Sequence, residues 1–164
     1  MHRLEQDKIY KHFIERTRIG NLHRWILYLT TGVIWLSGLI WILFHYFGVH
    51  HTDAGEIHSS MEPLAMKIHG AAAMAFMIVI GSLIPVHVRR GLALKRNLFS
   101  GIFLIANCAV LIMTGWVLYY LGTEQIRNVV SLIHWILGLA LPLLIYLHIL
   151  AWKREQSGQQ KILK

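Results

Sequence analysis

The sequence predicts an all-α membrane protein, a bundle of four transmembrane helices with both termini in the cytoplasm. The chain of 164 residues is 55% hydrophobic, and its Asp, Glu, Lys and Arg side chains avoid four long stretches. Each stretch can cross a hydrocarbon layer about 30 Å thick, which takes about 20 residues of helix. Only helices and closed barrels satisfy their backbone groups in lipid. The four uncharged stretches are 25–52, 68–88, 97–123 and 128–152.

The basic residues predict the orientation. Six Lys and Arg precede the first stretch, four lie in "RRGLALKR" and four follow the last stretch, whereas the other side has only Lys67 and Arg127. Cytoplasmic loops carry such an excess, so both termini should be cytoplasmic, and the loops at 50–62 and 122–128 should face outward. The formal charge of +8 then reflects topology and contact with anionic membrane lipid, and we expect no nucleic-acid partner.

The chain divides into three regions. Residues 1–24, beginning "MHRLEQDKIYKHFIERTRIG", mix polar and apolar side chains in a partly helical pattern, typical of an amphipathic arm on the cytoplasmic membrane surface. Residues 25–152 form the predicted transmembrane domain. Residues 153–164 are expected to form a flexible cytoplasmic tail. The first apolar stretch is too long for a cleavable signal peptide, and no small-residue cleavage site follows it.

Six of the eleven histidines lie in or beside the membrane segments. Histidine is costly within a membrane and normally faces the bundle interior or a partner. In the predicted topology the six fall at two depths, which favours two sites over one. The cytoplasmic layer holds His23, His87 and His148, and the outer layer holds His45, His69 and His134.

The spacing of these histidines favours haem. His134 and His148 are 14 residues apart, about 21 Å of rise and four turns less about 40°, so they share a helix face. Haem takes axial imidazoles and buries a flat macrocycle in an apolar bundle. A single membrane histidine could instead hydrogen-bond across helices, but two layers fit that explanation poorly. Nearby glycines such as Gly38, Gly70 and Gly138 would leave room for macrocycles or simply allow close helix packing.

The segments "LHRW", "KIHG" and "SLIHWILGLALPLLIYLH" resemble the four-helix, di-haem membrane cytochromes b. That group includes the bacterial cytochrome b-561 type and the membrane subunits of formate dehydrogenases and hydrogenases. The resemblance covers about residues 21–152. It implies two haem b groups in a bacterial cytoplasmic (inner) membrane, with one ligand to each haem from the fourth helix. The implied ligand pairs are His23 with His148 for the inner haem, and His69 with His134 for the outer haem.

His87 and His45 are further candidates, because each layer offers three histidines for two places. A pair of His87 with His148 would require strong helix tilt, since the spacing of 18 residues from His69 to His87 exceeds the 14 on the last helix by about 6 Å of rise. The sequence therefore favours His23 over His87, and His69 over His45.

The predicted function is electron transfer across the membrane between the quinone pool and a redox protein partner on the outer face. The resemblance implies quinone or quinol as partner, and we expect it near His87, Arg90, Asn97 and the N-terminal arm. No side chain is expected to be catalytic in itself. One alternative is a self-contained superoxide:quinone oxidoreductase, which would need an outer basic patch, although Lys67 and Arg127 share that side with four acidic residues. Another is a haem-free metal transporter.

Overall fold

The computed structural model describes residues 19–48, 50–52, 55–57, 59–95 and 97–162. Four helices in these ranges are long and apolar enough to cross a membrane, which confirms the predicted all-α class with four candidate transmembrane helices. They are α2 (Asn21–Phe47), α3 (Met61–Leu83), α5 (Leu98–Tyr120) and α6 (Glu124–Ile162). The predicted amphipathic arm lies almost entirely outside the described residues.

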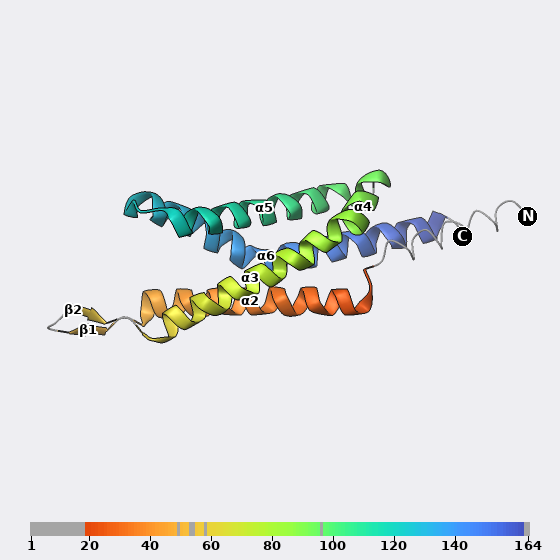
Figure 1. Ribbon diagram of the computed structural model, residues 1–164. Coiled ribbons are helices and arrows are strands. Elements are labelled where there is room, and N and C mark those ends of the chain that lie inside the picture. Colours follow the sequence, from red (N-terminus) through yellow and green to blue (C-terminus); the bar gives the residue numbers. More distant parts are fainter. Residues whose placement is uncertain (1–18, 49, 53–54, 58, 96, 163–164) are drawn as a thin grey trace, which may run out of the picture.

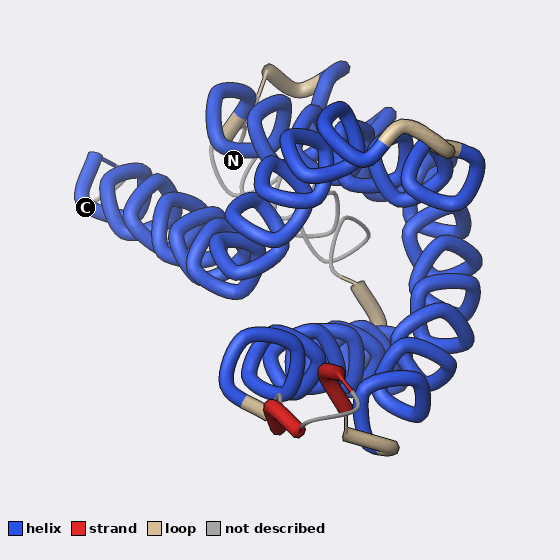
Figure 2. Tube along the Cα trace, turned by 90° about the vertical axis from the view of Figure 1, so that its left-hand side faces the viewer, coloured by secondary structure: helices blue, strands red, loops and turns tan. Residues whose placement is uncertain are grey.

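The helices form two antiparallel hairpins. α2 packs along α3, and α5 packs along α6, whereas α2 meets α6 over a smaller surface. α3 crosses α2 obliquely, so that it leaves α2 and approaches α5 towards the end where α6 finishes (Figure 1). Viewed along the bundle, the helices surround an interior, with α2 and α6 on either side of its open part (Figure 2). A cavity of about 490 Å³ lies between α2 and α6.

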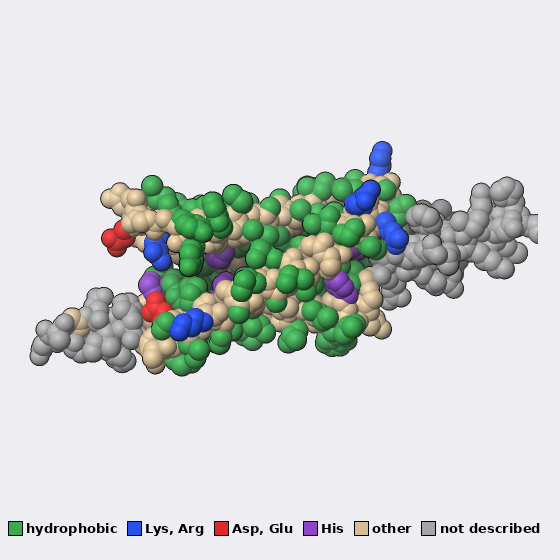
Figure 3. All heavy atoms as spheres, in the orientation of Figure 1, with side chains coloured by type: hydrophobic (Ala, Val, Ile, Leu, Met, Phe, Trp, Pro, Cys, Tyr) green, Lys and Arg blue, Asp and Glu red, His purple; other side chains and the backbone are tan. Residues whose placement is uncertain are grey.

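The middle of the bundle has a small apolar core. Phe76 of α3, Cys108 of α5 and Leu141 of α6 are buried together there. Large apolar side chains elsewhere point outward, such as Ile78 at 75% and Phe99 at 88% exposure. Hydrophobic side chains cover the visible face, while Lys and Arg lie near its two ends (Figure 3). This distribution suits helices that are surrounded by lipid rather than water.

The end of α3 departs from regular α-helix. A π-helical turn, η1 (Ile84–Val88), follows α3 and continues into the short α4 (Arg89–Ala93). Pro85 has no backbone N–H to continue the α-helical ladder, and the N–H of Arg89 bonds the carbonyl of Ile84, five residues back. Single π turns of this kind are rare and are frequent at functional sites. This turn carries His87.

Two further segments differ from the sequence-based expectation. The outward loop contains a small antiparallel hairpin of β1 (His50–Thr52) and β2 (Gly55–Ile57). The region expected to be a flexible tail from residue 153 is instead a continuation of α6, which stays helical to Ile162. Helix-forming residues such as Lys153, Arg154 and Glu155 directly follow the apolar span, so nothing in the local sequence stops the helix there.

Candidate cofactor site: two histidine pairs

His69 and His134 form the first histidine pair. His69 comes from α3 and His134 from α6, and their ring centroids are 6.2 Å apart with an interplanar angle of 71°. Both rings are partly buried in the interior. This is the pair that the resemblance implies for the outer layer.

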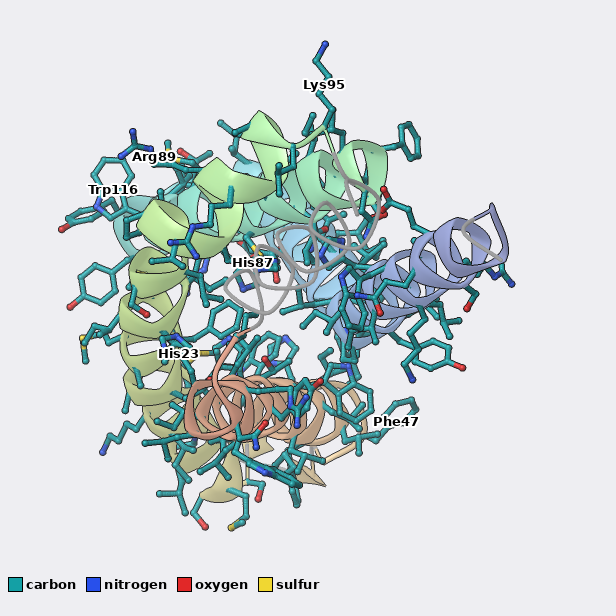
Figure 4. The ribbon with its side chains drawn as sticks, turned by 90° about the vertical axis from the view of Figure 1, so that its right-hand side faces the viewer. His23, Phe47, His87, Arg89, Lys95 and Trp116 are labelled. Atoms are coloured by element: carbon teal, nitrogen blue, oxygen red, sulfur yellow. The ribbon has the colours of Figure 1, made fainter. Side chains whose placement is uncertain are left out.

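His87 and His148 form the second pair, towards the end of the bundle where α6 finishes. Their ring centroids are also 6.2 Å apart, with an interplanar angle of 81°. His87 points into the space between the helices, while Arg89 and Lys95 point away from it (Figure 4). Both pairs therefore join the first helical hairpin to α6, at depths about 21 Å apart along that helix.

The ring separation matches what one metal held between two imidazoles requires. An imidazole nitrogen lies about 2 Å from a metal that it binds, and the centre of its ring about 1 Å further back. Two imidazoles on opposite sides of one metal therefore have their centres about 6 Å apart. Each of the two pairs, at 6.2 Å, has this separation.

Hydrogen bonds fix the protonation of His69. Its Nδ1 lies 3.0 Å from the carbonyl oxygen of Ile34 and 3.2 Å from the hydroxyl of Ser37, both on α2. A carbonyl oxygen can only accept, so Nδ1 must carry the proton and donate it. The neutral ring then has its lone pair on Nε2, the nitrogen that is available to a metal.

Hydroxyl groups of α5 lie within hydrogen-bond distance of Nδ1 of the two histidines of α6. Thr114 Oγ1 donates to the carbonyl of Val110 at 2.7 Å, so its oxygen accepts from Nδ1 of His134 at 2.8 Å. Ser100 Oγ donates to Oδ1 of Asn97 at 2.6 Å, so its oxygen is left to accept from Nδ1 of His148 at 2.9 Å; the Asn97 amide nitrogen lies 3.3 Å from the same Nδ1. Ligand histidines usually donate their second ring N–H in this way.

A glycine lies opposite each of these three rings. A Cβ on Gly38 would come within 3.2 Å of Cε1 of His69. A Cβ on Gly115 would be 3.2 Å from Cε1 of His134, and one on Gly101 would be 3.5 Å from Cε1 of His148. The imidazoles thus occupy space that larger residues at these positions would fill.

His23 is placed differently from the expectation. Its Nε2 lies 2.9 Å from the hydroxyl of Ser82 and 3.5 Å from the carbonyl of Val79, so it binds α2 to α3. His148 faces His87 in its place. The oblique course of α3 and the π turn at its end supply the tilt and rotation that this pairing requires (Figure 1).

His45 is the remaining candidate of the outer layer, and it contacts Glu62 and Trp41. Its Nδ1 lies 2.7 Å from Oε1 of Glu62, and its ring stacks on Trp41 with centroids 4.5 Å apart. Nowhere in the described residues do three or more His, Cys, Asp or Glu side chains gather as they would around a metal held by protein ligands alone.

α5 contains no histidine, so the histidine pattern alone predicts no site residue on it. Ser100–Gly101 and Thr114–Gly115 are separated by 14 residues, the same spacing as His148 and His134. Matching 14-residue spacings on two neighbouring membrane helices were the signal that could have identified these residues. Comparisons of the chain with protein-family models, with curated proteins and with solved structures find no match.

Proposed function

We propose that this protein is a membrane di-haem b-type cytochrome, which transfers electrons across the membrane between the quinone pool and a redox partner. One haem b would be held by His69 and His134, and the other by His87 and His148. The observation that carries the proposal is a pair of neighbouring imidazoles at each of two depths, with ring centroids 6.2 Å apart in both.

The donor set fits haem better than a metal bound by side chains alone. A haem supplies four equatorial nitrogens and asks the protein for at most two axial ligands, which is what each histidine pair offers. Sites built from protein ligands alone use three or four, and the described residues contain no such group. If both histidines of a pair held the haem, no open site would remain for oxygen, so the proposed activity is electron transfer.

Haem b, when bound, supplies one-electron redox chemistry at its iron. The chain contributes ligands, an apolar surrounding and charge. Lys67 precedes His69 by two residues, and Arg90, which is less exposed than Arg89, follows His87 by three residues. Such cations at both ends of the bundle could bind haem carboxylates, the strong partner of Lys and Arg.

The cavity between α2 and α6 offers a place for the quinone. Its lining is mainly apolar, and Tyr146 and Ile149 of that lining flank His148 on α6. Quinones are apolar molecules that move within the bilayer, so a cavity at a helix–helix boundary suits them. The site expected near Asn97 is less suitable, because the Asn97 amide donates to the His148 carbonyl at 3.0 Å.

A reduced-minus-oxidised spectrum of the purified protein tests the proposal. We expect b-type absorbance, two haems per chain and two components in a redox titration. His134→Ala should remove only the component of the first pair, and His148→Ala only the component of the second. His45→Ala is the matched control, since its ring binds Glu62, and it should keep both haems. A purified wild-type protein without b-type absorbance would overturn the proposal.

A further inference from the structure

α5 lies along the histidine-bearing face of α6, although it has no histidine of its own. On α6, His134, Leu141 and His148 follow one another at intervals of seven residues. On α5, Gly101, Cys108 and Gly115 have the same intervals. A seven-residue repeat keeps one face of a helix against its neighbour when the two cross at a small angle.

The two repeats are in register. Cε1 of His134 lies against Gly115, Leu141 packs with Cys108 in the core, and Cε1 of His148 lies against Gly101. Large side chains of α6 thus meet small residues of α5 at three successive levels. The packing sets the height and rotation of both imidazoles at once.

A second column of α5 supplies hydrogen bonds. Ser100 and Thr114 each precede one of the glycines, and each accepts the Nδ1 proton of the opposite histidine. Both hydroxyl protons are already committed, to Asn97 Oδ1 and to the Val110 carbonyl. With its proton placed in this way, each hydroxyl oxygen is left to accept from Nδ1, although the Asn97 amide nitrogen, a donor, also lies 3.3 Å from Nδ1 of His148.

We propose that Ser100–Gly101 and Thr114–Gly115 are positioning residues for the two α6 ligands, one hydroxyl–glycine pair for each haem. Each pair clears space for its imidazole, favours the Nδ1–H tautomer and makes Nε2 more basic. A more basic ligand favours ferric over ferrous iron. The hydroxyls therefore lower the reduction potentials of the two haems separately. The inference rests on the proposed di-haem function.

The test uses the full-length protein and substitutions that remove one hydroxyl at a time. Thr114→Val keeps the side-chain shape, and Ser100→Ala removes the other hydroxyl. We expect Thr114→Val to weaken binding of the His69–His134 haem by about 10- to 100-fold and to raise its reduction potential, with the second haem unchanged. Ser100→Ala should weaken binding of the His87–His148 haem and raise its reduction potential, with the first haem unchanged. Thr114→Ser and Ser100→Thr should restore both properties.

Thr30→Val is the matched control. The Thr30 hydroxyl donates to the backbone carbonyls of Ile26 and Leu27. This substitution should leave both potentials unchanged. The inference is overturned if Thr114→Val and Ser100→Ala shift both haems equally, or shift neither, or if the conservative variants fail to restore what the others lose. A purely structural role would change stability without this selectivity.

Nitrogen chemical shifts of His134 and His148 in protein prepared without haem separate this inference from the proposed function. The Nδ1–H tautomer should dominate in the wild type, and Thr114→Val should lose that preference at His134 alone. A wild type that binds no haem but shows this tautomer overturns the cytochrome proposal and keeps the positioning role. A wild type that binds two haems and lacks the tautomer preference supports the cytochrome proposal and overturns the positioning role.

Discussion

A histidine can bind a metal through either ring nitrogen, and its hydrogen bonds decide which one is free. At His69 the Ile34 carbonyl lies within hydrogen-bond distance of Nδ1, and at His134 and His148 a hydroxyl oxygen does so. At His23 it is Nε2 that contacts Ser82 and the Val79 carbonyl. His23 therefore bonds α3 through the ring nitrogen that the proposed function assigns to iron binding in the other three histidines.

The contrast predicts the outcome of two alanine substitutions. His87→Ala should remove the haem of the second pair and leave the first, because it removes one axial ligand. His23→Ala should keep both haems and cost at most about 1–3 kcal/mol of stability through the lost contact to α3. The haem-to-protein ratio and thermal denaturation measure both effects. The opposite result, haem loss only in His23→Ala, would restore the pair implied by the sequence resemblance.

The glycines predict a graded series. Gly115→Ala and Gly38→Ala place a Cβ 3.2 Å from an imidazole carbon, whereas Gly101→Ala leaves 3.5 Å, an ordinary contact. The first two should reduce haem occupancy of the His69–His134 pair, and Gly101→Ala should change the other pair little. Gly70→Ala is the control, since its Cβ meets nothing within 4 Å, and it should gain at most about 1 kcal/mol from helix propensity. Equal effects at all four positions would exclude steric clearance as the cause.

At the scale of helices, the sequence predicts the four spans because charge-free length alone decides whether a segment can cross lipid. The predicted topology places His69 and His134 at one depth together with His45, and the family resemblance implies the pair of His69 with His134. This sequence-based expectation fails at His87, because its orientation depends on the π turn and on the oblique course of α3. It also passes over Ser100 and Thr114, whose role depends on which helix packs against α6. Tertiary packing, rather than local pattern, decides these points.

Pro85 gives the π turn a testable cause. Pro85→Ala restores a backbone N–H that can bond the carbonyl of Gly81 and extend the α-helix through this segment. The rotation of His87 should then change, so we expect lower haem occupancy at the His87–His148 pair and none lost at the other. The ratio of the two haem components in a redox titration measures this. Pro142→Ala on α6 is the control for removal of a proline as such. Full occupancy in Pro85→Ala would show that the π turn does not depend on this residue.

At the scale of the whole molecule, the two hairpins touch each other less than their own helices do. The small core of Phe76, Cys108 and Leu141 is one link between them. A second link is the hydrogen bond from Trp35 Nε1 of α2 to the Leu139 carbonyl of α6, at 3.3 Å. Each histidine pair also has one member in the first hairpin and one on α6. Ligands bound between the hairpins would therefore contribute to the stability of the assembly by mass action.

A divided protein tests this arrangement. Fragments 1–95 and 97–164 each contain one complete hairpin, and neither contains both members of any pair. Expressed together in haem-sufficient cells, they should copurify and show b-type absorbance, whereas either fragment alone should show neither property. Their association should weaken when haem synthesis is limited or when His134 and His148 are both replaced by alanine. If the two fragments associate equally well with and without haem, the apolar core rather than haem holds the hairpins together.

The division of each pair between hairpins also sets an order of events during synthesis. The ribosome makes α2 and α3 first, so His69 and His87 enter the membrane before α6 exists to complete either pair. A haem that met the half-made chain would find one ligand instead of two at each level. If the proposed function holds, haem binding would have to wait for the last helix, and because α6 carries both remaining histidines, its insertion would complete both pairs in a single step.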